Sequence, residues 1–262
     1  MSFDRSIRVV FDEAPEDYDA GRPIYPEALT EDVIALSGIP EDGRILEIGP
    51  GPGKATLLFA RRGYRMLCLE LGAALAAQAA ANCRPYPRVQ IQRMTFEDWP
   101  LQPSAFDLVM SAQAFHWIPP EVGLPKCAAA LKDSGWLALF WNDYPTPDNE
   151  FFNQLAVIYQ EKAPDLASRS GKPSMEELVE IRRKSIQDSH LFDDVLLKRY
   201  PWEMTYTTER YLKLLNTFSD HRTLDEDTRR DLFGGIAELI EQHGGSFQRP
   251  FITALYMARV RR

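Results

Sequence analysis

The sequence predicts a doubly wound α/β fold with a mostly parallel sheet of seven strands and an inserted helical cap. Two patterns are the basis of this prediction. Between residues 44 and 142, short apolar runs alternate with stretches rich in Ala and Leu, the element order of a parallel sheet with crossover helices. Between residues 148 and 190, the apolar residues follow a helical period instead.

Five apolar runs predict the strands of the first half. Their hydrophobicity is nearly continuous rather than alternating, as in strands that are covered on both faces. Two of the intervening stretches end at Gly63 and Gly135, and glycine is a common residue at the end of a helix. The expected strands are 44–49, 65–71, 89–95, 106–111 and 136–142.

The segment after Asn142 is expected to form a helical cap between two strands. A loop with two prolines leads into apolar residues at helical spacing, and Ser174 and Glu177 have the spacing of a capping box. The segment, about 146–192, is too short for an independent domain. We therefore expect a single domain, residues 1–262, with this cap inserted.

The remaining residues are expected to complete the sheet. Runs at 195–206 and 251–260 have strand character and flank two helical stretches. The longer helix is expected to begin at Thr223 and Glu226 and to end at the two glycines that follow His243. With these two strands the sheet has seven.

Composition and charge limit the classes of function. The 262 residues include 30 Lys and Arg against 38 Asp and Glu, a net charge of −8, and so acidic a surface repels nucleic acid. The three cysteines form no C-x-x-C pair, and His190, His221 and His243 lie in no ligand spacing, so neither disulfides nor a metal are expected. No apolar stretch reaches the roughly 18 residues of a membrane span, so no membrane span is expected, and neither is a signal peptide. These features predict a cytoplasmic protein that acts on small molecules.

One glycine-rich turn is the main evidence for the chemistry. The segment ILEIGPGPGKAT, 45–56, follows an expected strand and precedes an expected helix. Gly49 and Gly51 lack side chains, so the backbone of the turn can approach a ligand at the helix N-terminus. Glu70 ends the next strand, where a doubly wound fold places a carboxylate on the hydroxyls of a ribose. The sequence thus predicts an adenosine ligand.

The residues around the turn distinguish among adenosine ligands. The dinucleotide fingerprint G-x-G-x-x-G needs glycine at position 54, where this chain has Lys54. Glu47, two residues before the first glycine, opposes a pyrophosphate but attracts an ammonium or sulfonium charge. S-adenosylmethionine has both of these charges, so it is the expected cofactor and nicotinamide chemistry is disfavoured.

In these features the chain resembles the class I S-adenosylmethionine-dependent methyltransferases, whose sheet is Rossmann-like. Two of the matching segments are similar to motifs of a small-molecule subgroup, and the pattern resembles the trans-aconitate methyltransferases, which esterify a carboxylate. The resemblance implies an N-terminal lid segment, residues 1–30, and methyl transfer to a small-molecule acceptor, with S-adenosylhomocysteine as the product. The segments are DYDAGRPIYP (17–26), EIGPGPG (47–53), LCLELG (67–72), MTFEDWP (94–100) and FDLVMSAQAFHWI (106–118).

These motifs supply the candidate site residues. His116 is the candidate catalytic residue, and Tyr25, His116 and Trp117 are candidates for binding the substrate. Among the cofactor-binding candidates, Arg22 is expected at the methionine carboxylate and Glu97 at the adenine amino group. The full cofactor-binding set is Tyr18, Arg22, Glu47, Gly49, Gly51, Glu70, Leu71, Phe96, Glu97, Ser111 and Gln113.

Several alternatives stay open from the sequence. Asp98 competes with Glu97 for the adenine, and both Arg22 and His116 have packing roles as alternatives. A phenol or amine acceptor benefits from a base such as His116, whereas a carboxylate is already ionised. The rival functions are a nucleic-acid or protein methyltransferase and a non-catalytic module that binds an adenosine ligand. The acceptor, the methylated atom and the oligomeric state are left open.

Overall fold

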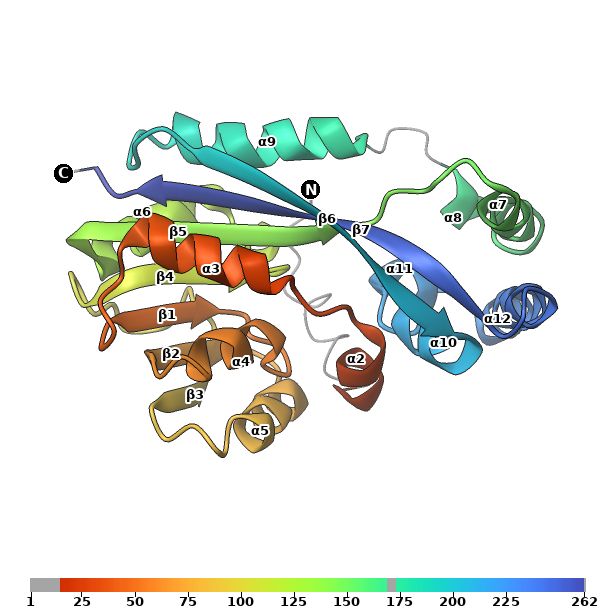
Figure 1. The fold of residues 1–262 in the computed structure, drawn as a ribbon, viewed down its shortest axis with the longest axis horizontal. Coiled ribbons are helices and arrows are strands. Elements are labelled where there is room, and N and C mark those ends of the chain that lie inside the picture. The colour runs from red at the N-terminus through yellow and green to blue at the C-terminus, as the bar shows by residue number, and fades with distance from the viewer. Residues whose placement is uncertain (1–14, 169–172, 262) are drawn as a thin grey trace.

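The fold is a mixed sheet of seven strands with helices packed on it (Figure 1). The structure is a computed structural model, and it describes residues 15–168 and 173–261. The strand order is β3-β2-β1-β4-β5-β7-β6, and β7 runs antiparallel to both of its neighbours, β5 and β6. The predicted doubly wound, mostly parallel sheet of seven strands is therefore confirmed. The strands are β1 Arg44–Ile48, β2 Arg65–Glu70, β3 Val89–Arg93, β4 Phe106–Ala112, β5 Leu131–Asp143, β6 Leu196–Thr207 and β7 Ser246–Arg259.

Helices connect these strands in the order that the sequence predicts. The capping box of Ser174 and Glu177 is present, and it begins α9. The helices are α2 Pro15–Gly21, α3 Glu27–Ser37, α4 Lys54–Ala60, α5 Ala73–Asn82, α6 Pro120–Ala130, α7 Glu150–Lys162, α8 Pro164–Ala167, α9 Met175–Asp188, α10 Thr208–Leu215, α11 Ser219–Arg222 and α12 Glu226–Gln242, with a 3-10 turn, η2, at Phe115–Trp117.

Two predicted helix boundaries are wrong. Gly135 does not end a helix but lies within β5, which begins at Leu131. The pairing with the neighbouring segment starts early, because the backbone N–H of Ala105 donates to the carbonyl of Ala130. The long helix α12 begins after Asp225, whose side chain accepts the backbone N–H of Thr228. An aspartate is as good an N-cap as a threonine, so the spacing alone did not select between them.

Alternation along the strands buries the sheet on both faces. In β1, Ile45 faces a core cluster with residues of α3 and α4, whereas Leu46 faces a second cluster with residues of α6 and α9. Because successive side chains of a strand point to opposite faces, one apolar run fills both clusters. The carboxyl ends of the parallel strands then meet at one edge of the sheet.

A second group of helices lies beyond that edge, formed by α7, α8, α10, α11 and α12 (Figure 1). Its own apolar core joins Phe152 of α7 to Tyr211 of α10 and Ile236 of α12. The segment predicted as a cap divides between two places, because α7 packs on α12 while α9 packs on α6. The edge of the sheet and this second group enclose the space that is described next.

The N-terminal segment is tied to the same edge. Residues 1–14 of the predicted lid lie outside the described residues, and α2 follows them. The Lys54 ammonium donates to the Asp19 carbonyl at 2.6 Å and lies 3.2 Å from the Asp19 carboxylate, which ties α2 to α4. No helix within 15–168 or 173–261 has the length and apolar character needed to cross a membrane.

Candidate functional site

A cavity of about 680 Å³ lies at the carboxyl ends of the parallel strands, within the range of roughly 300–1,000 Å³ for small-molecule sites. Its wall includes the ends of β1, β2, β4 and β5, the start of α11, and one side chain each from α9 and β7. Most of the predicted site residues are brought together here. Those that line the cavity are Tyr18, Arg22, Gly49, Gly51, Glu70, Leu71, Phe96, Glu97, Gln113, His116 and Trp117.

Two glycines and one carboxylate form the floor of the cavity. Gly49 and Gly51 have φ angles of 66° and 56°, a conformation that side chains disfavour, and a β-carbon on Gly49 would lie 2.5 Å from that of Ala114. Glu70 accepts the backbone N–H of Gly51 through Oε2 and that of Gly72 through Oε1, both at 2.9 Å. Glu70 therefore holds the turn in shape.

Glu47 is placed differently from the prediction. Its side chain is fully buried beneath α4, does not line the cavity, and accepts the Thr56 hydroxyl at 2.6 Å. Strand alternation explains this, because Glu47 is on the opposite face of β1 from Leu46 and Ile48. Burial raises the pKa of Glu47 to about 7, although the hydrogen bonds from Thr56 and Cys68 oppose the rise.

Two further predicted residues lie outside this cavity. Ser111 is fully buried and donates to the carbonyl of Ile48 at 2.8 Å, which joins β4 to β1. Tyr25 is buried, and its ring packs edge-on against Phe140 with 5.0 Å between the centroids. The geometry gives both side chains packing contacts, so their predicted roles at the cofactor and substrate gain no support from it.

One of two neighbouring acids lines the cavity. Glu97 is part of its wall, whereas Asp98 accepts the Thr95 hydroxyl at 2.7 Å in a local turn. The sequence left the choice between Glu97 and Asp98 open. The geometry favours Glu97 as the acid that faces a ligand.

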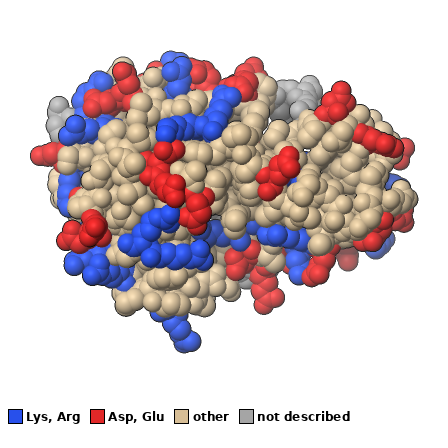
Figure 2. Space-filling view, in the orientation of Figure 1, with Lys and Arg blue, Asp and Glu red and all other residues tan. Residues whose placement is uncertain are grey.

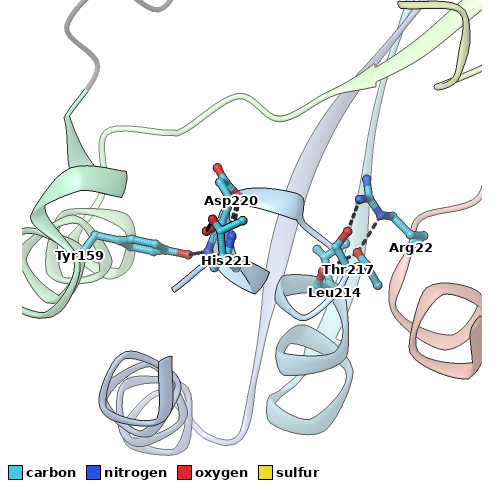
Figure 3. Close-up of polar contacts among 7 residues, drawn as sticks. Arg22, Tyr159, Leu214, Thr217, Asp220 and His221 are labelled. Carbon is cyan, nitrogen blue, oxygen red and sulfur yellow. Dashed lines mark hydrogen bonds and ion pairs between the residues drawn. The ribbon is translucent and has the colours of Figure 1, made fainter. Parts of the chain in front are cut away.

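Arg22 lies between two aromatic rings at the lid end of the cavity. Its guanidinium carbon is 5.0 Å from the Tyr18 ring centroid and 4.6 Å from that of Phe218. It donates to the hydroxyl and the carbonyl of Thr217, at 2.7 and 2.9 Å (Figure 3). Both acceptors are neutral, so these bonds position the positive charge without balancing it.

His116 is held in one tautomer by a tryptophan. The Trp141 indole N–H donates to His116 Nδ1 at 3.1 Å, and because an indole only donates, Nδ1 has no proton. The His116 ring is exposed to the cavity. The surrounding protein still removes much of its water, and this effect, with the charges of Arg182 and Arg22, lowers the pKa of His116 to about 4. The neutral ring therefore has its proton on Nε2.

Other lining residues were not predicted from the sequence. Asp143 and Tyr144 directly follow the predicted strand 136–142, so their place at the ligand-bearing edge was a usable signal. Arg182 and Arg249 come from distant segments that no motif marks. Among the described residues, no group of three His, Cys, Asp or Glu side chains is arranged to hold a metal ion.

Comparisons with known proteins agree with this geometry. A family model described as a methyltransferase domain matches residues 46–139. An uncharacterized methyltransferase-like protein of Schizosaccharomyces pombe is 26% identical over 85% of this chain and 82% of its own length. The trans-aconitate 2-methyltransferase of Variovorax paradoxus is 30% identical over 45% of this chain and 44% of its own.

Solved methyltransferase structures share the fold. A provisionally assigned type II methyltransferase of Anaeromyxobacter dehalogenans superposes with a TM-score of 0.63 at 20% identity, over 91% of this chain and 97% of that one. A second structure is phosphoethanolamine N-methyltransferase 2 of Haemonchus contortus, in complex with phosphomonomethylethanolamine and S-adenosylhomocysteine. It superposes with a TM-score of 0.54 at 15% identity, over 96% of this chain and 58% of that one. Residues 46–139 of this chain are thus a methyltransferase domain, in the fold of solved methyltransferases. These findings support the predicted family, enzyme class and cofactor.

The matched part of this methyltransferase contains the floor of the cavity but not its roof. Residues 46–139 include the glycine turn, Glu70, Glu97 and His116. The lid residue Arg22 and the whole second group of helices lie outside the match. The cavity is therefore lined both by residues that the family model matches and by residues outside it.

Proposed function

We propose that this methyltransferase transfers the methyl group of S-adenosylmethionine to a carboxylate of a small molecule. The observation behind the proposal is that one cavity contains both the glycine turn with Glu70 and, in the same wall, His116, Trp117 and Arg182. Cofactor and acceptor can thus meet inside a space of small-molecule size. Trans-aconitate 2-methyltransferases, among the similar proteins, are named for a small carboxylic acid.

The residues present fit the cofactor. Any β-carbon at Gly51 is disfavoured by its φ of 56°, which keeps the backbone open to a ligand. We propose that Glu70 accepts the ribose hydroxyls and that Glu97 accepts the adenine amino group, since both line the cavity. The charge of Arg22, whose hydrogen bonds to Thr217 go to neutral acceptors, is assigned to the methionine carboxylate.

The chain's own residues have to orient the acceptor rather than activate it. When bound, S-adenosylmethionine supplies a methyl group that is already activated by a positively charged sulfur. A carboxylate is ionised at neutral pH, so no base is needed, and the rate depends on holding the acceptor in line with the methyl group. We propose that His116 contributes by donating Nε2–H to the acceptor, a role that its tautomer permits.

A nucleic-acid acceptor is less favoured than a small molecule. The chain has a net charge of −8, and acidic and basic side chains are interspersed over the face shown in Figure 2. A continuous basic surface is the usual electrostatic requirement for a phosphate backbone. The solved relative with a bound acceptor, phosphoethanolamine N-methyltransferase 2, holds a small molecule.

Methyl-labelled S-adenosylmethionine tests the proposal directly. We expect label in a small carboxylate from a panel of carboxylates, phenols and amines, recovered as an ester that alkali hydrolyses. Gly51→Val is the matched inactive control, because it forces a β-branched side chain into a positive φ. Transfer to protein or RNA in preference to every small acceptor would contradict the proposal.

A further inference from the structure

A buried guanidinium without a counter-charge lies in the wall of the cavity. Arg249 of β7 is 9% exposed, and its guanidinium carbon is 5.7 Å from the Tyr144 ring centroid and 5.1 Å from that of Phe152. In the part of the chain that the structure describes, no hydrogen bond or ion pair reaches this side chain, and its Nε is buried without a partner. Buried charged side chains are nearly always paired, so Arg249 indicates an anion that the protein itself does not provide.

The other arginines of the cavity are accounted for. Arg182 donates to both carboxylate oxygens of Asp143, at 3.0 and 3.2 Å, so its charge is balanced within the protein. Arg22 is positioned by Thr217 and, under the proposed function, takes the carboxylate of the cofactor. Arg249 remains as a second uncompensated charge, which calls for a second anionic group.

A phenol lies beside Arg249, and the Arg22 guanidinium also acts on it. The Tyr144 hydroxyl is buried and, among the described residues, forms no hydrogen bond of good geometry. Its ring is fixed edge-on against Phe218 and Phe251, with centroids 5.7 and 5.2 Å away. Burial raises the pKa of Tyr144 more than the charges of Arg22 and Arg249 lower it, so the hydroxyl keeps its proton and can donate.

On the far side of this region, Asp220 and His221 of α11 are hydrogen-bonded to each other and to Tyr159 of α7. Asp220, which lines the cavity, accepts both the backbone N–H and the Nδ1–H of His221, at 2.9 and 2.8 Å. His221 Nε2 in turn bonds to the Tyr159 hydroxyl at 2.7 Å (Figure 3). These hydrogen bonds fix α11 against α7.

We propose that Arg249 and Tyr144 form a subsite that binds a carboxylate of the acceptor, separate from the group that is methylated. The proposal rests on the proposed function and deepens it. The forked guanidinium matches the two oxygens of a planar carboxylate, with the phenol as a third donor, and one unbalanced positive charge matches a monoanion. Because pairing with a guanidinium stabilises the charge of a carboxylate and weakens it as a nucleophile, the bound group is an anchor.

Binding to the protein loaded with S-adenosylhomocysteine tests the subsite without turnover. The probes are glutarate and phenylacetate, each compared by calorimetry with its uncharged amide, glutaramide and phenylacetamide. We expect a carboxylate to bind at least about 10-fold more tightly than its amide, the usual value of a hydrogen bond to a charged group. Arg249→Gln should abolish the difference and Tyr144→Phe should reduce it by about 5-fold. Arg183→Gln, an exposed arginine paired with Glu180 on α9, is the matched control and should change nothing.

The same variants distinguish the acceptor from the cofactor as the source of the carboxylate. Arg249→Gln should leave the affinity for S-adenosylhomocysteine within about 2-fold. A loss for S-adenosylhomocysteine but not for 5′-methylthioadenosine, which lacks the amino-acid part, would assign the subsite to the cofactor and overturn the proposal. Equal binding of acids and amides to the wild-type protein would also overturn it. Methyl transfer to a small carboxylate by that same protein would then show that the proposed function stands without the subsite. If Arg249→Gln does not fold, Tyr144→Phe decides the same question.

Discussion

The indole N–H of Trp141 donates to Nδ1 of His116 across 3.1 Å. Because this bond occupies the basic nitrogen of the neutral ring, the nitrogen left for the cavity bears a proton. A general base needs a free lone pair in reach of the proton it removes. The arrangement therefore favours His116 as a hydrogen-bond donor to the acceptor over His116 as a base.

His116→Ala should raise the KM for the acceptor by about 3- to 10-fold and change kcat little, the size of one lost neutral hydrogen bond. His116→Gln should recover most of the affinity, since its amide can donate in place of Nε2–H. With a pKa of about 4, His116 should give no inflection in kcat/KM between pH 6 and 9. Steady-state kinetics across that range checks both statements. If turnover by His116→Ala were instead slower by about two orders of magnitude, with loss of an inflection near neutral pH, the base mechanism would be restored.

Glu70→Ala should weaken the binding of S-adenosylhomocysteine by about 1.5 to 3 kcal/mol, the value of hydrogen bonds to a charged group. It should also lower the melting temperature of the ligand-free protein, because two backbone N–H groups lose their acceptor. Calorimetry and thermal unfolding measure the two effects. Glu27→Ala, which removes an exposed ion pair with Arg62, serves as the control. Unchanged affinity in Glu70→Ala would place the ribose elsewhere.

The sequence was sufficient for the floor of the site and for the sheet. Gly49, Gly51 and Glu70 lie within one strand-turn-helix-strand unit, and such local order is visible as spacing along the chain. The alternation of apolar runs and helices likewise identified all seven strands. These features depend on neighbours in sequence, which is why a pattern can reveal them.

The roof of the site could not be predicted in the same way. Arg249 reaches Tyr144 across more than a hundred residues, and the pairing of β7 with β5 that brings them together has no sequence signature. Glu47 was misplaced for a different reason. The motif places it near the turn, but the alternation of β1 directs its side chain away from the cavity, and the motif does not show which face is which.

Glu97→Gln should weaken the binding of S-adenosylhomocysteine by about 10-fold, because the amide offers one acceptor where the carboxylate offers two. Asp98→Asn is a matched control one residue away, and it should change the affinity by less than about 2-fold since Asp98 contacts Thr95 rather than the cavity. Titration calorimetry on both variants gives the answer. The reverse order of effects would assign the adenine to Asp98.

Glu47→Gln should make the stability of the protein less dependent on pH. The pKa of Glu47 is raised by burial from 4.5 to about 7, so between these values the folded protein holds a proton that the unfolded chain has released. Since the folded state then binds more protons, the free energy of unfolding falls as the pH rises through this window, by about 3 kcal/mol in total for this group. Above pH 7 the loss is complete, and below pH 4.5 it is absent. Urea unfolding of the wild type and the variant at pH 4.5 and pH 8 measures this change in the free energy of unfolding. Between these pH values the wild type should lose a few kcal/mol more than the variant. An equal change in both proteins would show that Glu47 is ionised in the folded protein throughout.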